Sequence, residues 1–276
     1  MKKIEYIGIL LLFALSLIYL NKTTNILKDK DPIMQNIVHN ANNYKIESVN
    51  AKINEDTIIP GTNGCVIDIN KSYEKMKKIN EYTDKMLKYK DLIPEITINN
   101  IYNKYIISGN ETKRNVSIII NINEEVEKLN TLVSTNKIKL NVFLDSEILK
   151  NDVISINKEY VKIYNGGLNN NYDDITIEWM NDVIMENYNQ SKYCINRNKN
   201  DYNLLICARN KMHTITPTIN VTKSNIHTAK TQINNGSIIY FDEKNIDNII
   251  TISDYIKSKG FKIVFLEELL SEKTCK

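Results

Sequence analysis

Short apolar segments alternate with helical patterns over the second half of the chain. Residues 116–120 form an apolar run broken by one serine, which is typical of a strand buried on both faces. The following segment carries Val126, Leu129 and Val133 at helical spacing. This alternation predicts a largely parallel sheet with crossover helices. Further strands are predicted at 138–144, 160–164 and 212–215, further helices at 146–156, 176–188 and 202–210, and a last strand, helix and strand between 236 and 265.

Residues before the main domain are organised differently. The polar, irregular segment 22–45 predicts a stalk with one short helix at 34–42. Residues 46–110 predict a compact lead-in segment, and residues 111–272 the main domain. Within the lead-in, turn and capping signals predict a strand at 48–53, a turn at 59–64, a helix beginning near 70 and a strand at 104–110.

An apolar run opens the chain. Lys2 and Lys3 precede residues 6–20, which reach the short edge of a membrane span and also fit the core of a signal peptide. The small residues Ala14 and Ser16 lie inside this run, which favours an uncleaved signal-anchor helix at 1–21 over a cleaved signal. Either alternative exports the body. Because the positive end stays inside, the sequence predicts a single-pass protein of the cell membrane with an extracytoplasmic body.

Composition narrows the classes of function. The 276 residues carry a net charge of +3 and are 42% hydrophobic and 25% charged, as in ordinary folded proteins. No basic run is long enough to indicate a nucleic-acid partner, and the lysines between 71 and 90 predict a solvated helix face. The cysteines lack CxxC spacing, which argues against a zinc ribbon. Export would permit disulfides, but nothing in the sequence pairs the four cysteines, which we expect to be free thiols: Cys65, Cys194, Cys207 and Cys275.

The end of the chain carries a specific pattern. Residues 236–242 read Gly-Ser-Ile-Ile-Tyr-Phe-Asp, a helical segment ends in Lys-Gly-Phe at 259–261, and Leu-Glu-Glu-Leu-Leu follows at 266–270. This order resembles the last strand, helix and tail of the polysaccharide deacetylase (NodB-homology) family. The resemblance covers residues 112–272 and implies an α/β fold, a distorted (β/α) barrel of the deacetylase type, preceded by the transmembrane helix and the lead-in. Parts of the lead-in, such as the Pro-Gly-Thr-Asn-Gly turn, resemble a segment of Gram-positive relatives.

The resemblance also implies what an active site would need. Active family members hydrolyse an acetyl group on a sugar with a divalent metal, commonly zinc, held by one Asp and two His. A second Asp acts as base and a His protonates the leaving group. The metal lowers the pKa of its water and polarises the acetyl carbonyl. In this sequence the base position is Asn121, the ligating Asp is Ile122, the ligand histidines are Gly166 and Asn170, and the protonating His is Asp242.

These replacements predict that no catalytic residue, metal site or cofactor of the family type is retained. The Arg-Pro-Pro-Tyr-Gly loop of the family falls on residues 194–198, which lack the Arg at its first position, the prolines and the glycine. None of the three histidines, His39, His213 and His227, falls on a ligand position. No GxSxG, HExxH or P-loop motif offers another chemistry.

Two weaker alternatives remain open in the sequence. Oxygen atoms near the predicted strand ends would suit calcium or magnesium, but a set with one carboxylate predicts poor affinity; its members are Asn121, Asn123, Asn170 and Asp242. Tyr172 and Trp179 are candidates for stacking on a sugar ring, although the helical spacing of Trp179 favours a core position. Asp173 and Asp174 are expected in a solvated loop.

The function predicted from the sequence is that of a catalytically degenerate pseudoenzyme. It would bind or scaffold an envelope glycan such as peptidoglycan, with the membrane contacted through the N-terminal helix. The binding residues would be Asn121, Asn165, Asn170 and Asp242. The alternative is an active carbohydrate deacetylase that hydrolyses acetyl C–N bonds through a rearranged site, with Asp242 and Glu243 as acid and base. A third possibility is a structural partner of another envelope protein, bound through residues 46–110.

Overall fold

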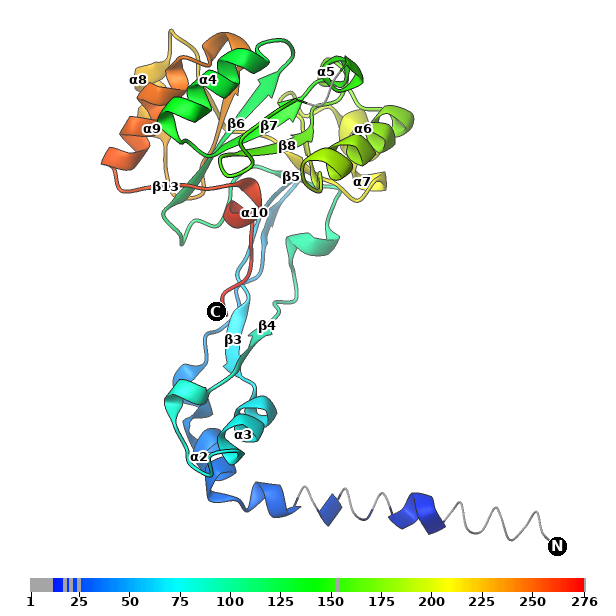
Figure 1. Ribbon diagram of the computed structural model, residues 1–276, viewed down its shortest axis with the longest axis vertical. Coiled ribbons are helices and arrows are strands. Elements are labelled where there is room, and N and C mark those ends of the chain that lie inside the picture. Colours follow the sequence, from blue (N-terminus) through cyan, green and yellow to red (C-terminus); the bar gives the residue numbers. More distant parts are fainter. Residues whose placement is uncertain (1–11, 17–18, 20–21, 24–25, 152–153, 276) are drawn as a thin grey trace, which may run out of the picture. The chain divides into compact units, whose positions relative to one another are not determined.

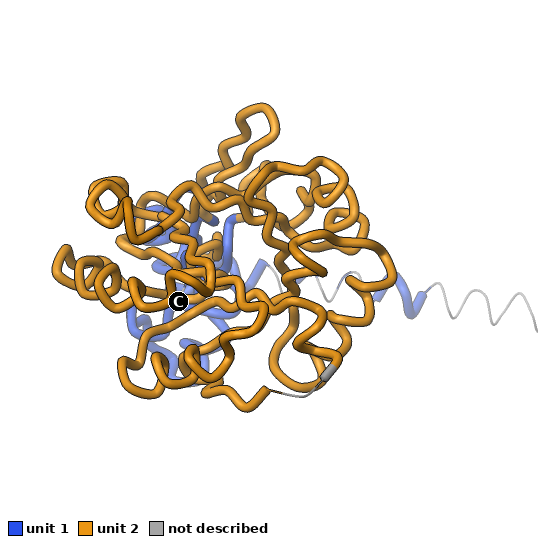
Figure 2. Tube along the Cα trace, turned by 90° about the horizontal axis from the view of Figure 1, so that it is seen from above, with its two compact units in different colours: residues 1–48, 63–92, 274–276 blue, residues 49–62, 93–273 orange. Residues whose placement is uncertain are grey.

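The structure is a computed structural model that describes residues 12–16, 19, 22–23, 26–151 and 154–275. The described chain forms two compact units, coloured separately in Figure 2. The first unit contains residues 1–48, 63–92 and 274–276, and the second contains 49–62 and 93–273. The lead-in predicted at 46–110 is therefore divided between the two units, and its boundaries do not coincide with theirs.

The second unit is built on a parallel sheet in which β6 is central (Figure 1). Its strands follow one another in the order β11-β12-β6-β7-β8, and β13 also pairs with β6. The predicted strands at 116–120, 138–144 and 160–164 are confirmed within it. The bounds are Asn115–Ile122 for β6, Leu140–Leu144 for β7, Val161–Asn165 for β8, Ile219–Asn220 for β11, Ile238–Asp242 for β12 and Lys262–Ile263 for β13.

A second sheet of this unit includes strands from the lead-in. Its order is β1-β2-β5-β10-β9, and β5 pairs in parallel with both β2 and β10. The strands are Lys52–Asn54 (β1), Thr57–Ile59 (β2), Tyr105–Ile106 (β5), Tyr193–Ile195 (β9) and His213–Ile215 (β10). The predicted strand at 104–110 is thus a short barrel strand. The sequence did not predict β9, whereas the equally short β10 was predicted at 212–215.

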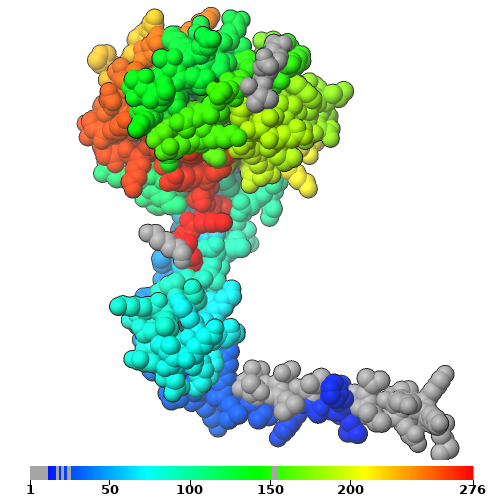
Figure 3. All heavy atoms as spheres, in the orientation of Figure 1, coloured from blue at the N-terminus to red at the C-terminus, as the bar shows by residue number. Residues whose placement is uncertain are grey.

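Strand residues alternate between an outer face and an inner face. On the outer face, apolar residues of β6, β7 and β8 pack against four helices: α4 (Val126–Asn136), α6 (Asp174–Asn187), α8 (Ile226–Gln232) and α9 (Asn248–Ser258). Figure 3 shows side chains of α4, α6 and α9 on this side of the unit. The inner face carries Ile119, Phe143, Tyr164 and Tyr240, which meet Ile58, Ile106 and Ile215 of the second sheet. The two sheets therefore enclose one apolar interior, as in a distorted barrel.

Two shorter helices complete the crossovers of the second unit. Helix α5 (Ser146–Asn151) follows β7, where the sequence predicted a helix at 146–156. Helix α7 (Asp201–Arg209) follows β9 and confirms the prediction at 202–210. Asn200 caps α7, because its side-chain oxygen accepts hydrogen bonds from the main-chain N–H groups of Tyr202 and Asn203.

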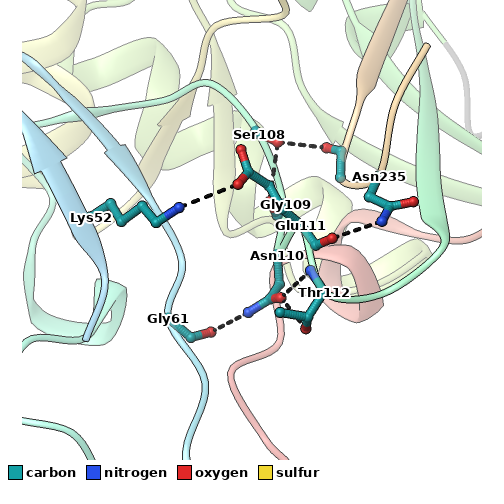
Figure 4. Close-up of polar contacts among 9 residues, drawn as sticks. Lys52, Gly61, Ser108, Gly109, Asn110, Glu111, Thr112 and Asn235 are labelled. Atoms are coloured by element: carbon teal, nitrogen blue, oxygen red, sulfur yellow. Dashed lines mark hydrogen bonds and ion pairs between the residues drawn. The ribbon is translucent and has the colours of Figure 1, made fainter. Parts of the chain in front are cut away.

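The segment leading into β6 is fixed to the barrel by polar contacts. Asn110 is 6% exposed and donates from Nδ2 to the main-chain oxygen of Gly61 at 2.9 Å, while its Oδ1 accepts from the N–H of Thr112 at 2.8 Å (Figure 4). Asn235 donates from Nδ2 to the main-chain oxygen of Glu111 at 2.8 Å. Nζ of Lys52 lies 3.3 Å from Oε2 of Glu111. These contacts make the segment a structural part of the second unit.

The first unit pairs two helices with a two-stranded sheet. Helices α2 (Pro32–Ala41) and α3 (Ile69–Lys77) bury Ile37 and Met76, and β3 (Gly64–Ile67) pairs antiparallel with β4 (Tyr89–Leu92). The predicted helices at 34–42 and from near 70 are confirmed. Each begins at an aspartate whose side chain caps the first turn, Asp31 for α2 and Asp68 for α3. The predicted stalk therefore contains a packed helix.

The expectation of free thiols is wrong. Cys65 pairs with Cys275 in the first unit, and Cys194 pairs with Cys207 in the second. The first pair joins residues 210 positions apart in the sequence, and the second joins β9 to α7. The fold brings these sulfur atoms together, so spacing in the sequence carried no signal for either pair.

The predicted signal anchor at 1–21 lies largely outside the described residues. Among the residues that are described, no helix is long and apolar enough to cross a membrane. The anchor stays a prediction from the sequence.

Candidate functional site

The position of the family's active site is the carboxyl edge of the parallel sheet. Asn121 near the end of β6 lies in register with Asp242 at the end of β12 and with Phe143 of β7. Because these residues are neighbours in parallel strands, their side chains point to the same, inner face. The two predicted site residues Asn121 and Asp242 are therefore brought to one edge.

Asn121 is joined there by Asn170. The Asn121 side chain is 4% exposed and donates from Nδ2 to Oδ1 of Asn170 at 2.8 Å. Asn170 has a positive φ of 63°, and its main-chain oxygen accepts from Nδ2 of Asn203 at 3.0 Å. Oδ1 of Asn121 is buried and has no hydrogen-bond partner among the described residues. An unpaired buried acceptor is unusual in a folded protein, so this oxygen marks a place where an added donor would be stabilising.

Ile122 and Asn165 lie on the opposite face of the sheet. Ile122 is fully buried in the apolar cluster beneath the outer helices. Asn165 is also fully buried, and its Nδ2 donates to the main-chain oxygen of Ile177 at 3.2 Å and to Oδ1 of Asn181 at 3.1 Å. Its Oδ1 accepts from the N–H of Gly167 at 2.9 Å. Asn165 thus fixes the loop after β8 to α6 and does not join the Asn121 and Asn170 pair.

Gly166 leaves no room for the histidine of the family pattern. A Cβ atom at this position would lie 2.6 Å from the main-chain oxygen of Leu144 and 3.2 Å from Oδ1 of Asn121. The N–H of Gly166 donates to the same Leu144 oxygen at 2.8 Å. The backbone of this loop therefore lies against β7, so a histidine at this position would also require the loop to shift.

The residues at this edge do not fit the divalent metal of the family. Ile122 faces the outer core, Gly166 has no side chain, and Oδ1 of Asn170 accepts from Asn121. In the described part of the chain, no cluster of three or more His, Cys, Asp or Glu residues is placed to hold a metal ion. The calcium or magnesium site considered from the sequence is not supported either. Asn123 contacts this edge by donating its main-chain N–H to Glu243, and not through its side-chain oxygen.

The two carboxylates after β12 make different contacts. Oδ1 of Asp242, which is half-buried, accepts from Nδ2 of Asn245 at 2.6 Å. Oε2 of Glu243 accepts from three main-chain N–H groups just before α4, at 2.9, 2.9 and 3.3 Å; the donors are Asn123, Glu124 and Glu125. Glu243 therefore stabilises the start of α4, where a negative charge is favourable.

Sequence reasoning missed Arg197 as a site residue. Its guanidinium carbon lies 4.5 Å above the centroid of the Tyr240 ring, which is on the inner face of β12. Burial raises the pKa of Tyr240 to about 12, an effect that the nearby Arg197 charge partly opposes. Arg197 is exposed, so its contact with the ring leaves guanidinium donors available to a ligand. The sequence did contain a signal, because the family's Arg loop falls on residues 194–198. The family has its arginine at the first position of that loop, whereas Arg197 lies three positions after the first residue, Cys194.

The other candidates from the sequence have structural roles. Tyr172 is 3% exposed, and its hydroxyl accepts from the N–H of Ile195 at 2.9 Å, so it offers no stacking surface. Trp179 packs against the outer core, as its spacing predicts. Asp173 caps α6, and the donated hydrogen bonds of Thr176 and neighbouring N–H groups lower the pKa of its carboxyl.

The histidines do not contribute to this edge. His213 begins β10 and stacks on Tyr102, with ring centroids 4.6 Å apart. Burial lowers the pKa of His213 to about 4. His39 lies in the last turn of α2, and His227 is exposed on α8.

Comparison with known proteins supports the fold assignment. No family model matches the sequence. The structure is similar to BA3943, a CE4 family pseudoenzyme of Bacillus anthracis, with a TM-score of 0.61 and 21% identity over 88% of this chain and 96% of that chain. It is also similar to a mutant of BA3943 with restored enzymatic activity, with a TM-score of 0.62 and 20% identity over 87% of this chain and 98% of that chain.

One curated relative matches at the level of sequence. The uncharacterized protein YlxY of Bacillus subtilis is 30% identical over 135 residues, which make up 48% of this chain and 42% of YlxY. The aligned region therefore spans less than half of that relative. Together with the strand order and the structural similarities, the residues at the sheet edge lead to one conclusion: the chain has the α/β fold of the CE4 polysaccharide deacetylase family.

Proposed function

We propose that the chain is a non-hydrolytic, glycan-binding or scaffolding pseudoenzyme of the bacterial cell envelope. The observation that carries the proposal is the pair of amides, Asn121 and Asn170, where the family pattern has a base and a metal ligand. An amide oxygen does not take up a proton as a catalytic carboxylate does, but amides donate to and accept from sugar hydroxyls. The similarity to the pseudoenzyme BA3943 supports the same interpretation.

The binding groups would lie at one edge of the barrel. Asn121 contributes an unpaired acceptor, Asp242 a half-buried carboxylate, and Arg197 a guanidinium resting on Tyr240. This set contains donors, acceptors and one positive charge, which are the kinds of group that bind sugar hydroxyls. An envelope glycan such as peptidoglycan is the ligand we propose, because the family that the sequence resembles acts on acetylated sugars.

An exported location is part of the proposal. Two disulfides join all four cysteines, and disulfides persist in oxidising, extracytoplasmic compartments. The apolar run at 6–20 supports export and membrane anchoring from the sequence side. Oxidised and reduced thiols counted by mass spectrometry in whole cells test this location. Fully reduced cysteines in protein isolated under acid quench would contradict it.

The alternative, an active deacetylase with Asp242 and Glu243 as acid and base, has less support. Glu243 accepts hydrogen bonds from three main-chain N–H groups at the start of α4, so its carboxylate caps that helix and is not free to act on a substrate. Asp242 accepts from Nδ2 of Asn245, an amide that does not titrate.

The test combines turnover, metal content and binding on one preparation. The full chain, purified in an uncharged detergent, is assayed for acetate release from N-acetylated chito-oligosaccharide and peptidoglycan fragments, with and without zinc. We expect no release, no stoichiometric metal, and measurable glycan binding by calorimetry. Arg197→Ala should weaken binding about tenfold, because a hydrogen bond to a charged group is lost. Arg209→Ala, which changes an exposed arginine in α7, is the matched control.

Each outcome of this test has a clear meaning. Zinc-dependent acetate release would overturn the proposal in favour of the enzyme. Absence of glycan binding by the folded wild-type protein would overturn the binding role. Equal weakening by both arginine variants would mean that charge alone, and not the sheet edge, determines binding.

A further inference from the structure

The first unit contains a basic hollow of about 880 Å³. It is defined by the C-terminal part of α3 and the residues that lead into β4. Five lysines, one glutamate and two tyrosines line it: Lys71, Tyr73, Glu74, Lys75, Lys77, Lys78, Lys88 and Tyr89. The sequence predicted a solvated helix face for these lysines, whereas the structure shows that they surround a concave surface.

Helical spacing brings several of these lysines to one side of α3. Lys71, Lys75 and Lys78 lie four and three residues apart, so they share a face of the helix. Like charges at this spacing repel one another and destabilise a helix. An anionic ligand in the hollow would replace that repulsion with attraction.

Two of the five lysines that line the hollow are paired with aspartates, and Glu74 adds one negative charge to the lining. Lys77 forms an ion pair with Asp31 at 2.7 Å, and Lys71 lies 3.6 Å from Asp68. Across the described part of the chain, the ammonium groups of Lys75, Lys78 and Lys88 have neither an ion pair nor a hydrogen bond. These three groups are therefore available to an external anion.

The aromatic side of the hollow is held in place. Tyr73 donates from its hydroxyl to Oδ2 of Asp31 at 2.9 Å, which fixes the ring beside the lysines. Lys28 lies over the same ring, with its Nζ 5.1 Å from the centroid, and donates to Oδ1 of Asn70 at 2.9 Å. A further positive charge thus stands beside the hollow.

We propose that this hollow binds a linear polyol-phosphate polymer, such as a glycerol-phosphate chain, whose units are joined by phosphodiesters. Successive phosphates along such a polymer match successive lysines along α3, and an ammonium group binds phosphate as a point charge. A concave surface suits a chain better than it suits a flat lipid bilayer, and several separated lysines suit a repeating ligand better than a single phosphate ion. The site belongs to the first unit, so the proposal does not depend on the glycan-binding function.

The experiment uses the full chain in an uncharged detergent and a synthetic glycerol-phosphate oligomer as the probe. The variant Lys75→Glu/Lys78→Glu should weaken binding at least tenfold, since each lysine near an anionic surface contributes roughly fivefold at moderate salt. Lys257→Glu/Lys259→Glu is the control, because these lysines occupy the last turn and the C-cap of α9, as Lys75 and Lys78 do in α3. Binding of the control should stay within about twofold of wild type. Lys75→Gln/Lys78→Gln gives a milder variant if charge reversal unfolds α3.

The outcomes separate the proposal from its competitors. Loss of binding only in the α3 variants supports it. Equal loss in the α9 control would overturn it, since net charge would then explain binding. If inorganic phosphate bound as tightly as the oligomer, the proposal that the ligand is a polymer would be wrong. Tighter binding of single-stranded DNA than of the oligomer would assign the surface to nucleic acid instead.

Discussion

Two polar clusters lie on the inner face of the same barrel and differ in how fully they are paired. In the tyrosine–glutamate cluster, the hydroxyl of Tyr164 lies 2.8 Å from both carboxylate oxygens of Glu267, and Asn141 bonds main-chain groups through both its amide oxygen and its amide nitrogen. In the amide cluster, Asn121 bonds Asn170 through its nitrogen, while its buried oxygen has no partner among the described residues.

The difference separates a structural role from a binding role. A buried polar network with every group paired fixes the packing of a core. A buried acceptor without a partner costs stability, and such a cost persists where a ligand supplies the missing donor. The tyrosine–glutamate cluster is therefore expected to control folding, and the amide cluster to control binding.

The largest expected effect concerns His213, which extends the aromatic packing around the tyrosine–glutamate cluster. Its ring stacks on Tyr102 and lies near Tyr193, which in turn contacts Tyr164. Burial holds the pKa of folded His213 at about 4, below its ordinary value of 6.5. The unfolded chain therefore takes up a proton between pH 6.5 and pH 4 that the folded chain does not. Stability is fully present above pH 6.5 and falls by about 3 kcal/mol across this window.

Urea denaturation at several pH values measures this effect. In His213→Gln the group that titrates is gone, so the free energy of unfolding should lose that part of its pH dependence. His227→Gln, at an exposed position on α8, should keep the wild-type dependence. An unchanged pH profile in His213→Gln would contradict the assignment.

The next effect comes from the tyrosine–glutamate cluster itself. Tyr164→Phe removes the hydroxyl that contacts Glu267 and leaves the carboxylate without that donor. We expect the free energy of unfolding to fall by about 2 kcal/mol, because a hydrogen bond to a charged group is lost. Tyr202→Phe, with an exposed side chain, should change it by less than about 0.5 kcal/mol. Glycan affinity should be the same in both variants. A loss of glycan affinity in Tyr164→Phe would contradict the assignment of a purely structural role to the tyrosine–glutamate cluster.

Much of this arrangement follows from the sequence, and the rest has identifiable physical reasons for being missed. The apolar run of β6 and the helical spacing of α4 and α6 predicted the parallel sheet, because a buried sheet imposes those patterns. The sequence also gave Asn121 and Asn170 as members of one site. It misplaced Asn165, since the face on which a residue lies depends on register, and a shift of one position exchanges the faces. It missed Arg197 because loop length sets where a loop side chain arrives, and no periodicity records it.

A smaller effect is expected at Gly166, where the loop after β8 lies against the backbone of β7. Gly166→Ala places a Cβ 2.6 Å from the main-chain oxygen of Leu144, so the loop must shift. We expect a loss of about 1–2 kcal/mol, typical of overpacking. Because the close contact is with backbone, the variant Asn121→Ala should not relieve it, and the two changes should add within about 0.5 kcal/mol. Strong non-additivity would mean that the Asn121 side chain, and not β7, excludes a side chain at 166.

The smallest effect on stability is expected at Arg197. Comparing it with Asn165 separates a residue expected to act in binding from one expected to act in folding. Arg197 is exposed and contacts the Tyr240 ring, whereas Asn165 is fully buried with three hydrogen-bond partners. Arg197→Ala should therefore lower the free energy of unfolding by only about 0.5 kcal/mol, the scale of an exposed cation–π contact. Asn165→Ala should lower it by more than 1 kcal/mol, because buried groups lose their partners. If glycan affinity instead followed Asn165 and ignored Arg197, the binding surface would lie on the outer side of β8 and not at the barrel edge.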